Sequence, residues 1–178
     1  MKSIFFIIGP TIGWFACVIG AAKDLFWLGP LLVTLLFLIS IGIRGKRFSS
    51  RILLLCSISL LLGLFFDSLL IGFNIYVPKR WLIPSPLTTI WLLALWVNFS
   101  ITIDTSLKWF QNHLGYAAIA GTIFGPTAYL AGQRLEALTI TKSNSVAIIV
   151  LAITWALAMV ALNVIARKLP SPAIKQSN

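Results

Sequence analysis

Charge is scarce in this chain of 178 residues, and negative charge is almost missing. Asp, Glu, Lys and Arg together make up 10% of the residues, and only four residues are acidic. In soluble globular domains about a quarter of the residues are charged, so this composition excludes an ordinary water-soluble domain. Hydrophobic residues make up 59% and extend from end to end. We expect one integral membrane domain over residues 1–178.

Metal-binding and catalytic side chains are also few. His113 is the single histidine, and Cys17 and Cys56 each stand in an apolar segment without a neighbouring cysteine or histidine. Such a set cannot form the usual zinc or haem sites within one chain, so we expect neither a metal nor a cofactor. GxSxG and HExxH motifs are absent as well, which argues against a hydrolase or a zinc protease.

The chain has instead six hydrophobic runs of membrane-spanning length. A hydrocarbon core of about 30 Å needs roughly 20 apolar residues in a helix. The runs that meet this need cover residues 4–21, 26–43, 52–76, 88–106, 116–134 and 146–166. Because the connections are short, neighbouring helices should be antiparallel. The sequence predicts an all-α, polytopic membrane helix bundle with six transmembrane helices.

The basic residues predict the orientation of this bundle, because Lys and Arg beside membrane helices are retained on the cytoplasmic side. With both termini cytoplasmic, the inner side collects nine of the fourteen: Lys2, Arg44, Lys46, Arg47, Arg51, Lys108, Arg167, Lys168 and Lys175. The outer side keeps Lys23, Lys79, Arg80, Arg134 and Lys142. Since apolar runs separate these charges, the net charge of +10 indicates membrane topology and not a nucleic-acid partner.

The first hydrophobic run has a second interpretation. Lys2, the apolar run and the sequence IGAAKD also resemble a secretory signal peptide with a small-residue cleavage site. Cleavage near Lys23 would leave five spans. We favour the six-span interpretation because the loop charges and the glycine spacing of this run fit a retained helix.

Small residues spaced about one helical turn apart form two ridges. Ala117, Gly121, Gly125, Ala128 and Gly132 fall on one face of the fifth run, and Gly9, Gly13, Cys17 and Ala21 on one face of the first. In lipid, helices associate where small residues let backbones approach closely. We expect both ridges to be helix contacts, with a contact between the two ridges as one option.

Pro126 interrupts the fifth run. Proline cannot donate a hydrogen bond to the carbonyl four residues earlier, that of Thr122, so a kink near Gly125 is expected. A structural kink is the simpler interpretation. A broken helix that lines a cavity, as in transporters, is the functional alternative.

Asp67 lies about two thirds of the way across the third run, where a charge costs several kcal/mol unless it is paired or hydrated. We expect Asp67 to face the bundle interior and to pair with Arg134. A proton or cation site and a neutral, protonated acid are the alternatives. Asp104, near the inner end of the fourth run, is expected to be far from Asp67. Asn98 adds a polar group at membrane depth that can bond across helices.

Several segments of the sequence resemble a known family. They are DSLL at 67–70, WLLALWVNF at 91–99, SLKWF at 106–110, GPTAYLAGQRLEAL at 125–138 and GWFACVIGAA in the first run. Together these segments are similar to a domain-of-unknown-function family of small multi-span inner-membrane proteins from Gram-negative bacteria. The resemblance covers nearly the whole chain. One departure is Glu136, where the family pattern RLGAL has glycine, and an exposed loop should tolerate it.

The resemblance implies a bacterial inner-membrane location and genetic company with cyclopropane-fatty-acid-synthase-like and flavin oxidoreductase-like proteins. We therefore expect a non-catalytic partner or scaffold for membrane lipid modification or stress, in contact with lipids and with a lipid-modifying enzyme or a second copy. One alternative is a small-molecule, lipid or proton-coupled carrier that uses Asp67. Another is an intramembrane lipid-modifying enzyme built from Asp67, Arg134, Asn98 and Tyr129.

Overall fold

The computed structural model describes residues 2–80 and 87–169, and these residues form six α-helices, one 3-10 helix and two short strands. In chain order they are α1 (Lys2–Ala22), α2 (Leu28–Arg44), α3 (Lys46–Gly72), β1 (Tyr76–Pro78), α4 (Ile90–Ile103), η1 (Lys108–Asn112), α5 (Leu114–Arg134), β2 (Leu138–Ile140) and α6 (Asn144–Lys168). The predicted all-α class is confirmed, and each predicted hydrophobic run overlaps one of the α-helices.

Four of the described helices are long and apolar enough to cross a membrane: α1, α3, α5 and α6. The other two are shorter, with 17 residues in α2 and 14 in α4. At 1.5 Å per residue, α4 extends over about 21 Å, which is less than the hydrocarbon core of about 30 Å. The structure supports insertion into a membrane, whereas the predicted crossing by α2 and α4 stays a prediction.

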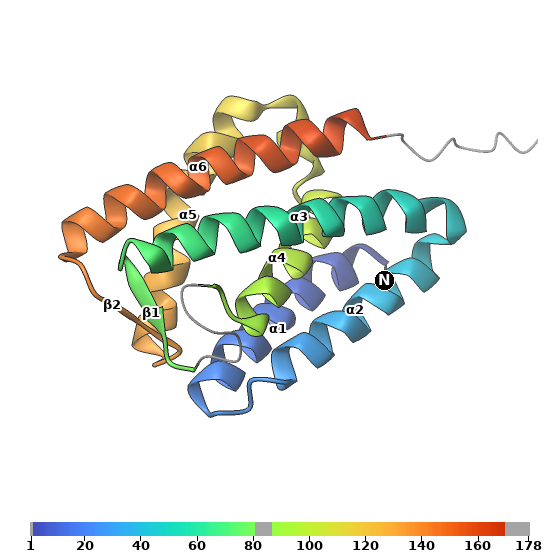
Figure 1. The fold of residues 1–178 in the computed structure, drawn as a ribbon. Helices are drawn as coiled ribbons and strands as arrows, with labels where there is room; N and C mark the ends of the chain where they lie inside the picture. The colour runs from blue at the N-terminus through green and yellow to red at the C-terminus, as the bar shows by residue number, and fades with distance from the viewer. Residues whose placement is uncertain (1, 81–86, 170–178) are drawn as a thin grey trace, which may run out of the picture.

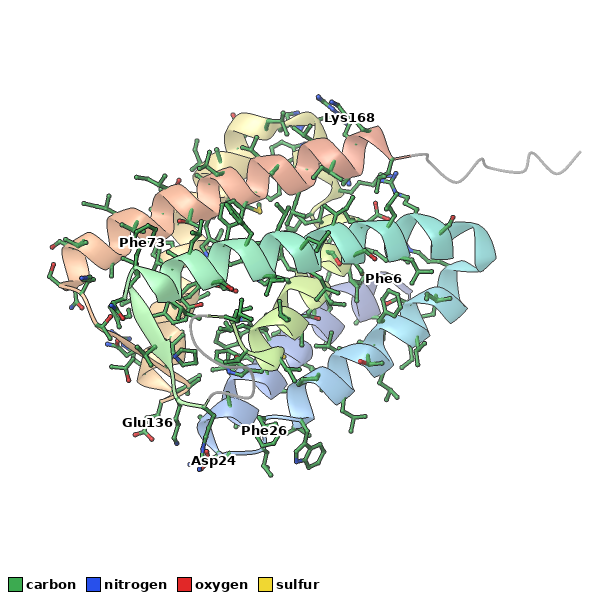
Figure 2. All side chains as sticks on the ribbon, in the orientation of Figure 1. Phe6, Asp24, Phe26, Phe73, Glu136 and Lys168 are labelled. Carbon is green, nitrogen blue, oxygen red and sulfur yellow. The ribbon has the colours of Figure 1, made fainter. Side chains whose placement is uncertain are left out.

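The α4 helix lies in the middle of the bundle and packs against α1, α2 and α3 (Figure 1). The surrounding helices carry large apolar side chains that point away from the bundle (Figure 2). Leu38 on α2, Leu61 on α3 and Ile119 on α5 are 57%, 66% and 58% exposed. A continuous apolar exterior of this kind matches lipid and would be unfavourable in water.

A two-stranded ribbon joins the end of α3 to the start of α6 (Figure 1). β1 and β2 pair antiparallel, with Tyr76 opposite Ile140 and Pro78 opposite Leu138. The third hydrophobic run predicts a helix up to residue 76, whereas α3 ends at Gly72. The ribbon satisfies backbone groups that would otherwise be left unpaired at this end of the bundle.

Three turns at the same end of the bundle contain a residue in the left-handed region: Asp24, Asn74 and Glu136, with φ values of 61°, 52° and 64°. Glu136 follows α5, where its N–H donates to the carbonyl of Gln133 and the next N–H donates to that of Gly132. Glycine is the residue most often found at this position after a helix. The expectation that this position tolerates glutamate agrees with the structure, in which the side chain of Glu136 is exposed.

The two ends of the bundle carry different ion pairs. At the ribbon end, Arg80 Nε donates to Asp24 Oδ1 at 2.7 Å, and this exposed contact lowers the pKa of Asp24 below its usual value. At the opposite end, Arg51 is buried against Asp104, with N–O distances of 2.8 and 2.9 Å. Of the basic residues used to predict orientation, Lys175 lies outside the described residues.

Candidate functional site

The glycine ridge of α5 packs against α6. A methyl group added at Gly121 would meet the carbonyl of Trp155, and one added at Gly125 would meet the Trp155 side chain. The ridge of α1 faces other helices: a methyl group at Gly13 would lie 2.7 Å from Asn98 Oδ1 of α4. Glycines of both ridges thus lie close to a neighbouring helix, and the two ridges face different partners.

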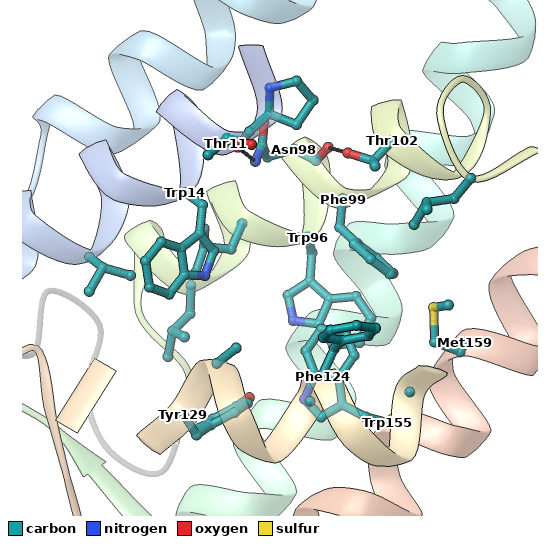
Figure 3. Close-up of a pocket in the computed structure, with 18 of the residues that line it drawn as sticks. Thr11, Trp14, Trp96, Asn98, Phe99, Thr102, Phe124, Tyr129, Trp155 and Met159 are labelled. Atoms are coloured by element: carbon teal, nitrogen blue, oxygen red, sulfur yellow. Dashed lines mark hydrogen bonds between the residues drawn. The ribbon is translucent and has the colours of Figure 1, made fainter. Parts of the chain in front are cut away.

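This pairing leaves a cavity of about 580 Å³ between the α1–α4 side and the α5–α6 side. Its wall extends from Phe6 and Ser106 at one end of the bundle to Val18 and Leu138 near the other. Along α1, the twelve residue steps from Phe6 to Val18 correspond to a rise of about 18 Å. Figure 3 shows aromatic side chains from both sides of this space, including Trp14, Trp96 and Phe124. The lining is mainly apolar and aromatic.

Two prolines lie within helices that line the cavity. α5 runs without interruption through Pro126, so the broken helix considered from the sequence is not found. In α1, Pro10 cannot donate to the carbonyl of Phe6. The hydroxyl of Ser106 donates to this carbonyl at 2.5 Å. A side chain from the segment after α4 thus satisfies the acceptor that the proline leaves free.

Near the ribbon end of the cavity, Asp67 accepts hydrogen bonds from three uncharged donors. The hydroxyls of Tyr76 and Tyr129 donate to its Oδ1 at 2.9 and 2.5 Å, and the indole Nε1 of Trp96 donates to its Oδ2 at 2.8 Å. Asp67 is 1% exposed, and all three donors are buried. The four side chains come from α3, β1, α5 and α4, so the cluster ties these elements together.

The predicted ion pair between Asp67 and Arg134 is wrong. Arg134 is exposed at the end of α5, and the described ion pairs are Arg51–Asp104 and Arg80–Asp24. Tyr129, five residues before Arg134 on the same helix, makes the contact to Asp67 instead. A phenol fits an apolar interior better than a guanidinium because it brings no second charge to desolvate.

Two members of the cluster, Tyr76 and Trp96, were missed as partners of Asp67. The sequence predicts Tyr76 at the end of the third helix. In the structure Tyr76 lies on β1, and its hydroxyl reaches Asp67 on α3. Trp96 reaches Asp67 because Gly63, one turn earlier on α3, leaves room for the indole ring. The spacing of Gly63 and Asp67 is visible in the sequence, but the choice of partner depends on how α3 and α4 pack.

The wall formed by α1 and α4 carries further polar groups. Asn98 donates from Nδ2 to the carbonyl of Pro10 at 2.8 Å, while its Oδ1 is buried without a protein partner. The hydroxyls of Thr11 and Thr102 each donate to the carbonyl four residues earlier in their own helix. The two threonines therefore retain only oxygen lone pairs as polar function, whereas Asn98 retains the acceptor Oδ1 and the second N–H of Nδ2.

The Asp67 cluster should contribute measurably to stability. We expect Tyr129→Phe to lower the free energy of unfolding by about 1–3 kcal/mol, because a buried acceptor loses a donor. Tyr116→Phe on the same helix is the matched control, since Tyr116 is 60% exposed, and should change stability by less than about 0.5 kcal/mol. Denaturation in mixed micelles followed by circular dichroism measures both. Equal effects would contradict a specific role for Tyr129.

Metal binding has no support among the described residues, where no group of three or more His, Cys, Asp or Glu side chains could hold an ion. Of the candidate residues predicted from the sequence, Asp67, Asn98, Tyr129, Gly121, Gly125 and Gly132 line the cavity. Pro126 is buried in α5 next to this wall, Gly9 and Gly13 lie on the α1 ridge, and Arg134 lies apart.

Comparison with known proteins gives a family for this chain. A search of the curated proteins and a search of the solved structures each found no match. The family model described as "Protein of unknown function (DUF2878)" matches residues 3–161, which include all of α2 to α5 and most of α1 and α6. The resemblance expected from the sequence is confirmed, and the chain belongs to the DUF2878 family.

Proposed function

We propose that this protein is a multi-pass membrane protein that binds one lipid-like molecule in the cavity between its α1–α4 side and its α5–α6 side. The observation that carries the proposal is the cavity itself, about 580 Å³ in volume with a mainly apolar wall. Small-molecule sites usually measure about 300–1,000 Å³ and combine apolar walls with a few polar groups. Asp67 and Asn98 supply such groups here.

The proposed arrangement in the membrane has six crossings and both termini in the cytoplasm of a bacterial cell, with the protein in the inner membrane. Two ion pairs support alternating crossings, because Asp24–Arg80 and Arg51–Asp104 join loops and helix ends that alternate along the chain. The proposed arrangement keeps α1 as a helix of the mature protein, where it packs against α2 and α4. Retention matters because α1 forms one wall of the cavity.

Filling the cavity tests the proposal. Ala128 lies on α5 and lines the cavity, so Ala128→Phe should occupy space that a ligand needs. Ile123 is 55% exposed on the same helix, which makes Ile123→Phe the matched control. After mild extraction, native mass spectrometry should find a lipid-like molecule bound to wild type and to Ile123→Phe, and at least about tenfold less of it on Ala128→Phe. Equal retention by the two variants would refute the proposal.

A carrier is the second candidate, and it is favoured by the position of Asp67 in the cavity wall. Intramembrane acids often mark the path of a proton or a substrate. Purified protein in proteoliposomes should then show flux of a lipid-like solute or of protons that Asp67→Asn abolishes. Binding without flux would separate a binding protein from a carrier.

The link to membrane lipid modification also remains a proposal. A chain that holds a lipid-like molecule could present it to a modifying enzyme as partner or scaffold, alone or as a homodimer. Deletion of the gene followed by lipidomics, together with crosslinking in native membranes, tests this role. An unchanged lipid profile without a crosslinked enzyme would remove its support.

A further inference from the structure

The polar groups in the cavity wall are mostly hydrogen-bond acceptors. Thr11, Thr102 and Ser106 each donate their hydroxyl hydrogen to a helix carbonyl, at 3.1, 3.1 and 2.5 Å. A hydroxyl has one hydrogen and two lone pairs, so these three side chains offer lone pairs to an occupant. Asn98 Oδ1, buried without a partner, is a fourth acceptor.

Asp67 is a fifth acceptor, and it is placed near one end of the cavity. A carboxylate has about four lone-pair sites. Two hydrogen bonds reach Oδ1 and one reaches Oδ2, so Oδ2 can accept one more. Tyr129 does not change this balance, because its hydroxyl already donates to Asp67.

Positive charge is missing from this wall. The described residues that line the cavity include no Lys, Arg or His, and Asp67 is the one acidic residue among them. Among the buried side-chain nitrogen atoms of this wall, the one without a hydrogen-bond partner is the uncharged indole Nε1 of Trp91. A carboxylate or phosphate placed here would meet lone pairs and a carboxylate without a cation, which is costly in an apolar site.

We propose that the cavity selects an amphiphile with an apolar chain and a head group that donates hydrogen bonds and carries no negative charge, namely an alkyl ammonium or an alcohol. Such a head supplies a donor for the carboxylate of Asp67 and for the wall hydroxyls, while the aromatic wall receives the chain. An ammonium gains in addition from aromatic rings close to the carboxylate. The inference deepens the proposed function and rests on it, since it names the class of molecule that the same cavity binds.

Three chain-matched probes test the selection: hexadecylamine, hexadecanol and hexadecyl phosphate, each brominated on the chain. The full-length protein is placed in phosphatidylcholine nanodiscs, whose choline head has no N–H or O–H group. Bromine on a bound chain quenches the tryptophans in the wall. Ala128→Phe, with the cavity filled, gives the background from probe dissolved in the bilayer.

We expect the amine or the alcohol to bind at least about tenfold more tightly than the phosphate, as the cost of unpaired buried polar groups implies. Tighter binding of the amine identifies an ammonium head, and tighter binding of the alcohol a hydroxyl head. Thr102→Val removes one hydrogen-bond acceptor from the wall. It should therefore reduce the preference for the amine or the alcohol over the phosphate. Thr127→Val on the exposed face of α5, where the hydroxyl makes the same kind of backbone bond, should leave it unchanged.

The possible failures are distinct. Phosphate binding as tight as that of the amine and the alcohol would overturn the head-group inference while keeping a lipid-binding cavity. If Thr102→Val and Thr127→Val behave alike, the α4 hydroxyl does not select the head, which also contradicts the inference. If none of the three probes quenches above the Ala128→Phe background, the proposed function fails together with it.

Discussion

Arg51→Ala is expected to lower the free energy of unfolding by about 3–5 kcal/mol, the cost of removing one partner of a buried ion pair. Arg51 donates twice to Asp104 Oδ1 and once each to the carbonyls of Ala166, at 2.6 Å, and Leu169, also at 2.6 Å. The last carbonyls of a helix have no partner within it, so Arg51 also caps α6. The substitution leaves a buried carboxylate and two helix-end carbonyls without these donors.

The exposed ion pair provides the control for Arg51. Arg80 and Asp24 lie at a similar distance, 2.7 Å, but their side chains are 60% and 47% exposed. Arg80→Ala should therefore have a small effect, since solvent screens exposed pairs. Unfolding of both variants in mixed micelles gives the comparison, and equal losses would contradict the clamp formed by Arg51.

A double substitution distinguishes a paired charge from a general loss of packing. Arg51→Met combined with Asp104→Leu removes both charges, so no carboxylate remains buried alone. The double variant should be more stable than Arg51→Ala and non-additive with respect to the single changes. Additive losses would show that the two residues act independently.

Gly121→Leu is expected to separate α5 from α6 and to destabilise the protein by about 1–3 kcal/mol or more, as overpacking does. The nearest atoms to a side chain at this position belong to the backbone of Trp155, which cannot rotate away as a flexible side chain would. Because this contact also shapes the cavity, the same variant should bind less of the lipid-like molecule.

Gly115→Leu is the matched control for Gly121→Leu. Gly115 lies on the same helix, and a methyl group there would meet no atom within 4 Å. Leucine also favours the helix over glycine by several tenths of a kcal/mol, so this variant should be as stable as wild type or slightly more stable. If both leucine variants have the same free energy of unfolding, the close contact of Gly121 with α6 does not contribute to stability.

The helices could be predicted from the sequence because their cause is local. A lipid environment requires every backbone hydrogen bond to close within a segment, and the length of an apolar run then predicts a helix. Each of the predicted runs overlaps an α-helix, and the exposed leucines and phenylalanines agree with lipid around them. The predicted end of the third helix was wrong, because Tyr76 pairs with Ile140 in a strand ladder. Such a pairing joins segments far apart in the chain and has no local signal.

The candidate site could be predicted only in part. The sequence identified Asp67 as a residue that must face the interior, since its charge is costly in lipid. It suggested Arg134 as the partner because opposite charges are the simplest pairing to read from composition. Tyr129 and Trp96 fill that role, because the packing of α4 and α5 brings neutral donors to the carboxylate.

The helical class, the ridges of small residues and the need to satisfy Asp67 inside the bundle can all be predicted without a structure. These properties depend on hydrophobic length, residue size and the cost of buried charge, all of which are local. Only the tertiary structure decided which helices the ridges meet, and hence that a cavity separates the α1–α4 side from the α5–α6 side. Its acceptor-rich wall also appears only there, because hydroxyl orientation depends on backbone hydrogen bonds and on contacts between helices.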